Sequence, residues 1–140
     1  MIRSLLCLAL LLLMGYGVYN SINASKFQKK DAFMQYSPGM LSSLSSAHSP
    51  SLIHLSGDKC IICKIQWMKV DKSLLKSEAA KRGYEVYEYN IDPATWGAVL
   101  KEMSPYGVFG VPDYVFINKD GKVKVLTSIS GTEDLLREMV

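Results

Sequence analysis

The sequence predicts an α/β fold in which a central mixed sheet is flanked by helices, preceded by an N-terminal membrane or signal segment. Short apolar runs that alternate with amphipathic helical patterns indicate the α/β part. Two strand patterns separated by a tight turn near the C-terminus indicate a hairpin, and residues 4–25 carry no charge. With 140 residues, 49% of them hydrophobic and 21% charged, the chain is long enough for one folded domain and hardly for two.

We expect three parts: a signal anchor or signal peptide over 1–25, a linker over 26–50, and the folded domain over 51–140. The charges give no indication of nucleic-acid binding. The chain has 16 Lys and Arg residues and 13 Asp and Glu residues, a net charge of +3, and these charges are spread along the sequence. Because a nucleic-acid site needs a concentrated basic patch, we expect no nucleic acid among the partners.

The first 25 residues are typical of a segment that enters a membrane. A run consisting mostly of leucine follows Arg3, and the strongly apolar part ends near Tyr19. A membrane-spanning helix needs about 20 apolar residues, so a cleaved signal and an uncleaved anchor both remain open. We favour the anchor because the residues before Ala24 make a poor cleavage site. Cys7 is interpreted as a small apolar residue of this segment rather than as a lipidation site.

The basic residues around this segment disagree with a simple export signal. Lys26, Lys29 and Lys30 follow it, whereas only Arg3 and the amino terminus precede it, and positive charge usually stays on the cytoplasmic side. The cysteine motif and the family resemblance described below favour export all the same. We therefore expect a domain anchored in the membrane and facing the periplasm or another extracytoplasmic space, or secreted after signal cleavage.

The first structural elements are expected in and after a serine-rich stretch. Residues 37–51 have the composition of a linker, but Ser37 can cap one short helix within them and Pro38 suits its first turn. The apolar side of this helix consists of Met40, Leu41, Leu44 and Ala47. The apolar run at 52–55, which is bounded by a proline and a glycine, then predicts a buried strand.

One long helix is expected after this strand, ending at Gly83. The residues that share its apolar face are Ile61, Ile65, Met68, Leu75 and Ala79. The alternation of aromatic residues or valine with glutamate over 84–89 predicts the next strand. Asp92 and Pro93 begin another helix. Its inward-facing residues are Trp96, Val99, Leu100 and Met103.

The C-terminal part predicts a hairpin and a last helix. Strand patterns at 114–117 and 122–126 flank Asn118-Lys119-Asp120-Gly121, which has the residues of a tight turn. After Gly131, Thr132 can cap a helix that carries two acidic residues in its first turn. The expected order is strand, helix, strand, helix, hairpin and helix.

Cys60 and Cys63 form a C-x-x-C pair directly after the predicted strand and at the start of the predicted helix. Free amide hydrogens and the helix dipole favour a thiolate at Cys60, by at most about 2 kcal/mol. Lys59 and Lys64 add positive potential there, and Asp58 opposes it. In this position the pair predicts a redox site in which Cys60 attacks and Cys63, one turn into the helix, resolves the mixed disulfide.

Two structural uses of the same pair are less favoured. A structural zinc site needs four ligands, and the chain has no second C-x-x-C pair and only His48 and His54. A structural disulfide would close so short a loop that it would hardly constrain the unfolded chain. We therefore predict neither a metal nor a cofactor.

The chain from about residue 52 to residue 140 resembles the thioredoxin family, in particular its exported, membrane-anchored members. The segments that carry the resemblance are Cys60-Ile61-Ile62-Cys63-Lys64, Asn90-Ile91-Asp92, 106–112, 116–123 and Gly131. The resemblance implies a thioredoxin-like fold. It also implies that Pro112 is a cis-proline packed against the active-site disulfide, with the backbone of Val111 turned outward to pair with an extended substrate.

The chain departs from the family pattern at three places. Where the family commonly has Trp-Cys-Gly-Pro-Cys, Lys59 precedes the first cysteine and two isoleucines separate the pair. His54 occupies the place of the family's buried acid, either as a neutral acceptor for the Cys63 proton or as a satisfied strand histidine. Asp113 follows the expected cis-proline where the family usually has threonine. Its charge would disfavour the Cys60 thiolate, so a buried Asp113 is expected to be neutral.

These observations predict a thiol-disulfide oxidoreductase with protein substrates that carry disulfides or thiols, and with a thiol-redox partner that regenerates the pair. The catalytic residues are Cys60, Cys63 and Pro112, supported by Lys59, Lys64, His54, Val111 and Asp113. By analogy with exported relatives, reduction of disulfides in exported proteins is favoured. Two other functions remain open: a redox-independent binding or assembly module that uses the apolar surface of Ile61, Ile62 and Pro112, and a Cu(I)-handling protein, since thiolates select Cu(I).

Overall fold

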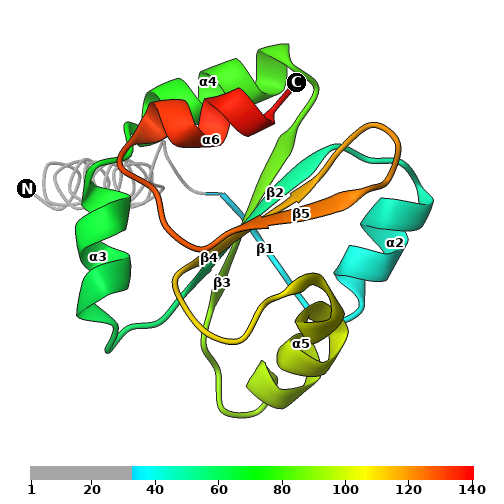
Figure 1. Ribbon diagram of the computed structural model, residues 1–140, viewed down its shortest axis with the longest axis vertical. Helices are drawn as coiled ribbons and strands as arrows, with labels where there is room; N and C mark the ends of the chain where they lie inside the picture. The colour runs from blue at the N-terminus through cyan, green and yellow to red at the C-terminus, as the bar shows by residue number, and fades with distance from the viewer. Residues whose placement is uncertain (1–32) are drawn as a thin grey trace, which may run out of the picture. The chain divides into compact units, whose positions relative to one another are not determined.

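A five-stranded mixed sheet forms the centre of the structure, as predicted (Figure 1). The computed structural model describes residues 33–140. The strands are β1 (Met34–Gln35), β2 (Ser51–Ser56), β3 (Glu85–Asn90), β4 (Asp113–Ile117) and β5 (Val123–Leu126). Their order across the sheet is β1-β3-β2-β4-β5. β1, β3 and β2 are parallel, β4 is antiparallel to β2, and β5 is antiparallel to β4.

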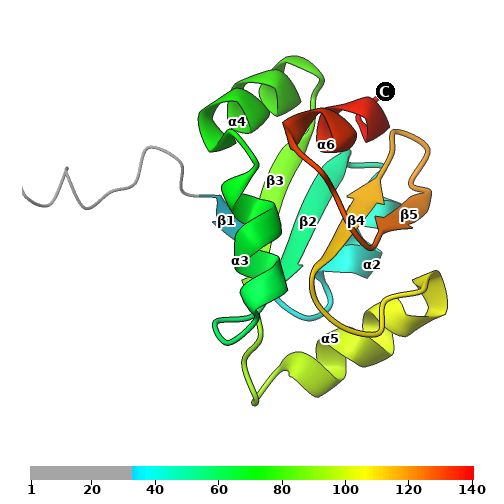
Figure 2. The same cartoon turned by 60° about the vertical axis from the view of Figure 1, so that its left-hand side comes forward.

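Helices cover both faces of this sheet (Figure 2). They are α2 (Met40–Ser46), α3 (Ile61–Met68), α4 (Lys72–Lys81), α5 (Trp96–Met103) and α6 (Thr132–Glu138). α3, α4 and α6 lie on one face, where Leu75 and Leu135 belong to the core. α2 and α5 lie on the other face, where Leu41 and Val99 belong to a second core cluster. The sheet is therefore buried on both sides, which explains why β2 reads as a continuous apolar run.

The parallel pairing of β2 and β3 brings the ends of both strands to one edge of the sheet. Ser56 pairs with Asn90 in the register, and the Ile91 N–H donates to the Ser56 carbonyl oxygen at 2.9 Å. The loops that follow the two strands therefore start side by side. α3 begins at the end of the first of these loops, which places its first turn at this edge.

The prediction of one long helix after β2 is wrong, because the chain forms two helices with a break at Asp71. The Asp71 carboxylate accepts the Leu74 N–H at 3.0 Å and so caps the start of α4. The Asp71 N–H donates to Thr132 Oγ1 at 2.8 Å, so the Thr132 hydroxyl stabilises this break. The prediction that Thr132 caps α6 is wrong, because no side chain caps that helix. A long-range contact thus replaces the expected local cap.

The apolar face assigned to the first part of that helix is also wrong. Ile61, Ile65 and Met68 are 73%, 49% and 80% exposed. α3 instead directs Cys63 and Trp67 toward the sheet, where Trp67 packs against the core. The outer surface of α3 is therefore apolar and open to solvent.

The compact unit begins at Phe33, before the boundary expected at residue 51. β1, which the sequence did not predict, extends the sheet at β3, and α2 is the short helix that was predicted. The Tyr36 hydroxyl donates to the Glu102 carboxylate, which also accepts the Leu41 N–H at 2.9 Å. These bonds attach the segment to α5, so residues 33–50 belong to the fold and are not a linker.

The strands predicted at 52–55 and 84–89, the hairpin and the last helix are confirmed. The predicted signal or anchor segment lies outside the described residues. Between residues 33 and 140, no helix combines the length and the apolar character needed to cross a membrane.

Candidate redox site at the start of α3

Cys60 and Cys63 are joined by a disulfide at the first turn of α3, with 5.3 Å between their Cα atoms. Cys60 has an extended backbone and occupies the N-cap position, where its Sγ accepts the Cys63 N–H at 3.2 Å. Cys63 is fully buried, whereas Cys60 is partly exposed. A reacting group from outside can therefore approach the pair only from the side of Cys60.

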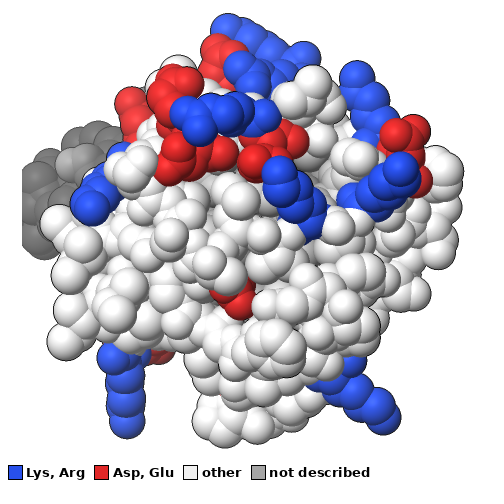
Figure 3. All heavy atoms as spheres, viewed as in Figure 1, with Lys and Arg blue, Asp and Glu red and all other residues white. Residues whose placement is uncertain are grey.

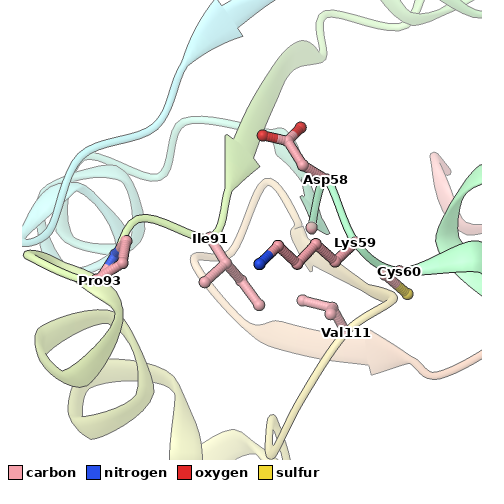
Figure 4. A pocket seen from close by; sticks show the side chains of 7 residues that line it. Asp58, Lys59, Cys60, Ile91, Pro93 and Val111 are labelled. Atoms are coloured by element: carbon pink, nitrogen blue, oxygen red, sulfur yellow. The ribbon is translucent and has the colours of Figure 1, made fainter.

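A pocket of about 450 Å³ opens beside Cys60 (Figure 4). Its apolar walls are Ile91 and Pro93, from the loop after β3, and Val111, from the loop before β4. Gly57 lies between them, and a Cβ at this position would lie 3.5 Å from Ile91 Cδ1 and 3.7 Å from both Cys60 Cβ and Val111 Cγ2. The missing side chain of Gly57 thus leaves room next to the first cysteine.

The Val111–Pro112 peptide bond is cis, which agrees with what the family resemblance implied. Pro112 is buried and Val111 is half-buried. Because Val111 lines the same pocket as Cys60, this bond lies at the border of the site. The structure therefore brings Cys60 and Val111 together at the pocket, and Pro112 follows Val111 in the chain.

The charged residues near the disulfide occupy different places. The Lys59 side chain extends across the pocket in Figure 4, and none of the ion pairs formed between residues 33 and 140 includes it. The Asp58 carboxylate points away from the Lys59 ammonium in the same view and accepts a hydrogen bond from the Asn90 amide. Lys64 is exposed on α3 and does not line the pocket. Lys59 is thus the cation placed closest to a site for substrate.

His54 lies in an aromatic stack that includes Trp67 of α3. Its ring centroid is 3.8 Å from that of Trp67 and 5.2 Å from that of Tyr114, with interplanar angles of 15° and 12°. Its Nε2 is buried without a hydrogen-bond partner among the described residues. Burial and the charge of Lys72 lower the pKa of His54 to about 3. Such a histidine is neutral at pH 7 and does not retain a proton taken from Cys63, so the structure favours a packing role.

Asp113 is buried, and its side chain lies on the opposite face of the sheet from His54. Burial raises the pKa of Asp113 to about 6, against the opposing effect of the Gly110 and Phe109 N–H groups, which donate to its carboxylate. The expected neutral carboxyl therefore exists only below about pH 6. Above that pH the charged carboxylate holds the loop that leads to Val111.

Solved structures of thioredoxin-like proteins match this arrangement over most of the chain. The C-terminal domain of Neisseria meningitidis DsbD in its oxidised form matches with a TM-score of 0.55 and 15% identity, covering 76% of this chain and 96% of that domain. Trxlp from Edwardsiella tarda matches with a TM-score of 0.59 and 18% identity, covering 78% of this chain and 99% of that protein. The chain has a thioredoxin-like fold.

A third thioredoxin-like structure, desulfothioredoxin from Desulfovibrio vulgaris Hildenborough in its reduced form, matches with a TM-score of 0.55. Its identity is 21%, and the match covers 78% of this chain and 98% of that protein. No family model and no curated protein matches the sequence. The similarity at these identities concerns the fold alone.

The thioredoxin-like fold also assembles residues that the sequence analysis did not combine. Gly57, Ile91 and Pro93 meet beside Cys60 because they follow the ends of two neighbouring parallel strands. That signal was available, since the carboxyl ends of parallel strands share one edge of a sheet. The stacking of Trp67 on His54 had no comparable signal, because it depends on how α3 is rotated about its axis.

Proposed function

We propose that this chain is a thiol-disulfide oxidoreductase in which Cys60 is the nucleophile and Cys63 the resolving cysteine. The observation that carries the proposal is the disulfide at the start of α3, with a partly exposed first cysteine and a fully buried second one. The helix N-terminus and the neighbouring Lys59 both favour a thiolate at Cys60 once the disulfide is reduced.

The reaction starts from the reduced pair. The Cys60 thiolate attacks one sulfur of a substrate disulfide, a Cys60–substrate bond forms, and the substrate S–S bond breaks; the leaving thiolate takes a proton from water. Cys63 then loses its proton and attacks Cys60 Sγ, which forms the Cys60–Cys63 disulfide and releases the second substrate thiol. Two electrons pass from the pair to the substrate, and an external dithiol partner must return them.

Turnover of a model protein disulfide, with a dithiol in excess, tests this proposal. The wild-type chain should accelerate reduction, Cys60→Ser should fall to the background rate, and Cys63→Ser should be slower than wild type, because only the added dithiol can then resolve its mixed disulfide. In a separate incubation without dithiol, reduced Cys63→Ser should accumulate mixed-disulfide adducts that appear on non-reducing gels and disappear with reductant. Cys60→Ser should form none. A wild-type chain without turnover, or a Cys60→Ser variant with it, would contradict the proposal.

We propose reduction as the direction, with disulfides of exported proteins as substrates. The support is the apolar N-terminal segment behind Arg3 and the analogy with exported relatives stated above. Equilibration with dithiol buffers measures the reduction potential. A reductase is expected below about −230 mV, whereas a value near about −120 mV would indicate an oxidase.

The proposed location, anchored in the membrane and facing the extracytoplasmic space or secreted, needs its own test. A reporter that is active only after export, fused after Val140, should be active. A silent fusion combined with an active cytoplasmic reporter would contradict export and would agree with the basic residues at 26–30.

A redox-independent docking module is a second candidate, and the exposed apolar side chains around the site favour it. Ile61, Ile62 and Phe109 are 73%, 61% and 80% exposed. Such side chains are typical of a surface that binds another protein. The Cys60→Ser/Cys63→Ser double variant distinguishes the two functions: a docking module would bind its partner unchanged, whereas an oxidoreductase would lose its covalent intermediate.

A further inference from the structure

The pocket beside Cys60 combines three apolar walls with one cation. Ile91, Pro93 and Val111 form the walls, and the Lys59 side chain lies across the opening (Figure 4). The other charged residue in the lining, Asp58, is directed away and is hydrogen-bonded to Asn90. Lys59 is therefore the charged side chain of this lining that extends across the pocket.

The face drawn in Figure 3 has most of its charged side chains over α4 and α6 and on the side of the β4–β5 turn, whereas the area over α3 and α5 is mostly uncharged. The charged side chains in the pocket lining itself are Lys59 and Asp58. Of these two, Lys59 is the group that can attract a negatively charged substrate.

We propose that the Lys59 pocket selects extended substrate segments in which an aliphatic side chain and a carboxylate flank the reacting cysteine. This inference rests on the proposed oxidoreductase function and adds the class of substrate. The aliphatic group removes apolar area from water against Ile91, Pro93 and Val111, as in other largely apolar sites of similar volume. The carboxylate pairs with the Lys59 ammonium. Because Lys59 is exposed, this pair has the modest, salt-sensitive strength of a surface ion pair.

Lys59 also stands next to the nucleophile, so a change at Lys59 alters the reactivity of Cys60 toward every substrate. A comparison of several substrates on one protein removes this common effect, because it multiplies all rates equally. The selectivity ratio therefore reports recognition, whereas the absolute rate reports both recognition and the thiolate. The same logic applies to changes at Gly57, which borders Cys60 as well.

The experiment uses short peptides with one cysteine, activated as a mixed disulfide with a chromogenic thiol, and the reduced full-length chain. Leucine precedes the cysteine, and Glu, Gln or Lys follows it. At low ionic strength the wild-type chain should reduce the Glu peptide roughly three to five times faster, in the second-order rate constant of a single turnover, than the Lys peptide, with Gln between them. Added salt should bring the ratio toward one.

Variants of Lys59 assign the preference. Lys59→Met should bring the three rates together, and Lys59→Glu should reverse their order. Lys69→Glu makes the same charge change at an exposed residue at the end of α3, outside the pocket lining, and should keep the wild-type ratio. A preference that survives in Lys59→Met, or that Lys69→Glu changes as much as Lys59→Glu does, would overturn the assignment.

A variant of Gly57 tests the aliphatic part. In Gly57→Val the added methyl groups enter the space between Ile91 and Val111, so reduction of the leucine peptide should fall more than reduction of a peptide with glycine before the cysteine. Equal loss for both peptides would contradict the apolar subsite. If no peptide is reduced at all, the proposed oxidoreductase function itself fails; if all are reduced at equal rates, only the selectivity does.

Discussion

Cys60 and Cys63 are one helical turn apart, yet solvent reaches them very differently. Cys60 occupies the N-cap of α3 and is partly exposed, and Cys63 is fully buried beneath it. The helix N-terminus also stabilises a negative charge on Cys60. These two differences act in the same direction, because reagents such as iodoacetamide need both access and a thiolate.

We therefore predict that limited alkylation of the reduced chain at mildly acid pH labels Cys60 first. Cleavage after Lys59 and Lys64 releases a five-residue peptide that contains both cysteines, and fragment masses assign the label within it. Excess label on Cys63 would reverse the assignment of roles. Full denaturation before alkylation provides the control, since both cysteines should then react alike.

His54 shows where residue-level inference from sequence ends. Its position six residues before Cys60 was visible, but its stacking partners were not. The buried Nε2 without a partner among the described residues costs stability that an apolar ring of similar shape would not. His54→Phe is accordingly predicted to be at least as stable as wild type at pH 7, measured by urea unfolding; a loss of several kcal/mol would mean that the imidazole makes a contact of its own.

At the scale of elements, the turn between β4 and β5 is held against the C-terminal end of α2. Gly121 has a φ of 77°, and a Cβ at this position would lie 2.5 Å from the Ser45 carbonyl oxygen. The Ser45 hydroxyl also donates to the Gly121 carbonyl oxygen at 2.6 Å. The glycine is therefore required both by its backbone conformation and by the close approach of α2.

We predict that Gly121→Ala lowers the free energy of unfolding by about 2 kcal/mol or more, because the left-handed conformation costs about 1–2 kcal/mol and the Cβ displaces α2 as well. Gly97→Ala is the matched control. Gly97 lies in α5 with nothing within 4 Å of an added Cβ, so this change should stabilise by about 0.5–1 kcal/mol. Equal effects of the two substitutions in urea unfolding would refute the proposed contact.

The elements that could be predicted were those with a strong local pattern. β2, β3 and the hairpin follow from apolar runs, alternation and turn residues, and α5 was predicted from its apolar face but begins at Trp96 rather than at Asp92 and Pro93. β1 could not be predicted, because it consists of only Met34 and Gln35, both exposed, and exists through pairing with β3. The break at Asp71 was missed although Asp71 is a good N-cap residue whose carboxylate accepts the Leu74 N–H; only its contact with Thr132 is distant in sequence. At the site, the cysteine motif was predicted from its local pattern, whereas the pocket could be inferred only by combining the ends of two parallel strands.

Across the whole molecule, two buried groups give opposite responses to pH. Folding lowers the pKa of His54 from 6.5 to about 3. Between pH 6.5 and pH 3 the unfolded chain therefore binds a proton at His54 that the folded chain does not bind. The free energy of unfolding decreases as the pH falls through this range. Folding raises the pKa of Asp113 from 3.8 to about 6. Between these pH values the folded chain therefore binds a proton at Asp113 that the unfolded chain does not bind. The free energy of unfolding decreases as the pH rises through this range. Between about pH 4 and pH 6 the two contributions largely cancel.

Single substitutions should separate these contributions. Asp113→Asn removes the contribution of Asp113 and leaves that of His54. As the pH falls from 6 to 4, the unfolding free energy of this variant should decrease, relative to that of the wild type, by up to about 1.4 kcal/mol per pH unit. His54→Phe should show the opposite relative slope over the same range. Urea titrations at a series of pH values, with the disulfide intact, measure both. Parallel profiles for wild type and both variants would contradict the assigned titrations.

The stacking of Trp67 on His54 gives the protein an optical reporter. The chain has two tryptophans, so Trp96→Phe would leave Trp67 as the single source of tryptophan emission. A protonated imidazole in contact with an indole ring quenches its fluorescence, whereas a neutral one does so much less. With the His54 pKa near 3, the emission of this variant should stay constant down to about pH 4 and then fall before the fold is lost. Fluorescence would then report the charge of a single buried ring behind the helix that carries the cysteines.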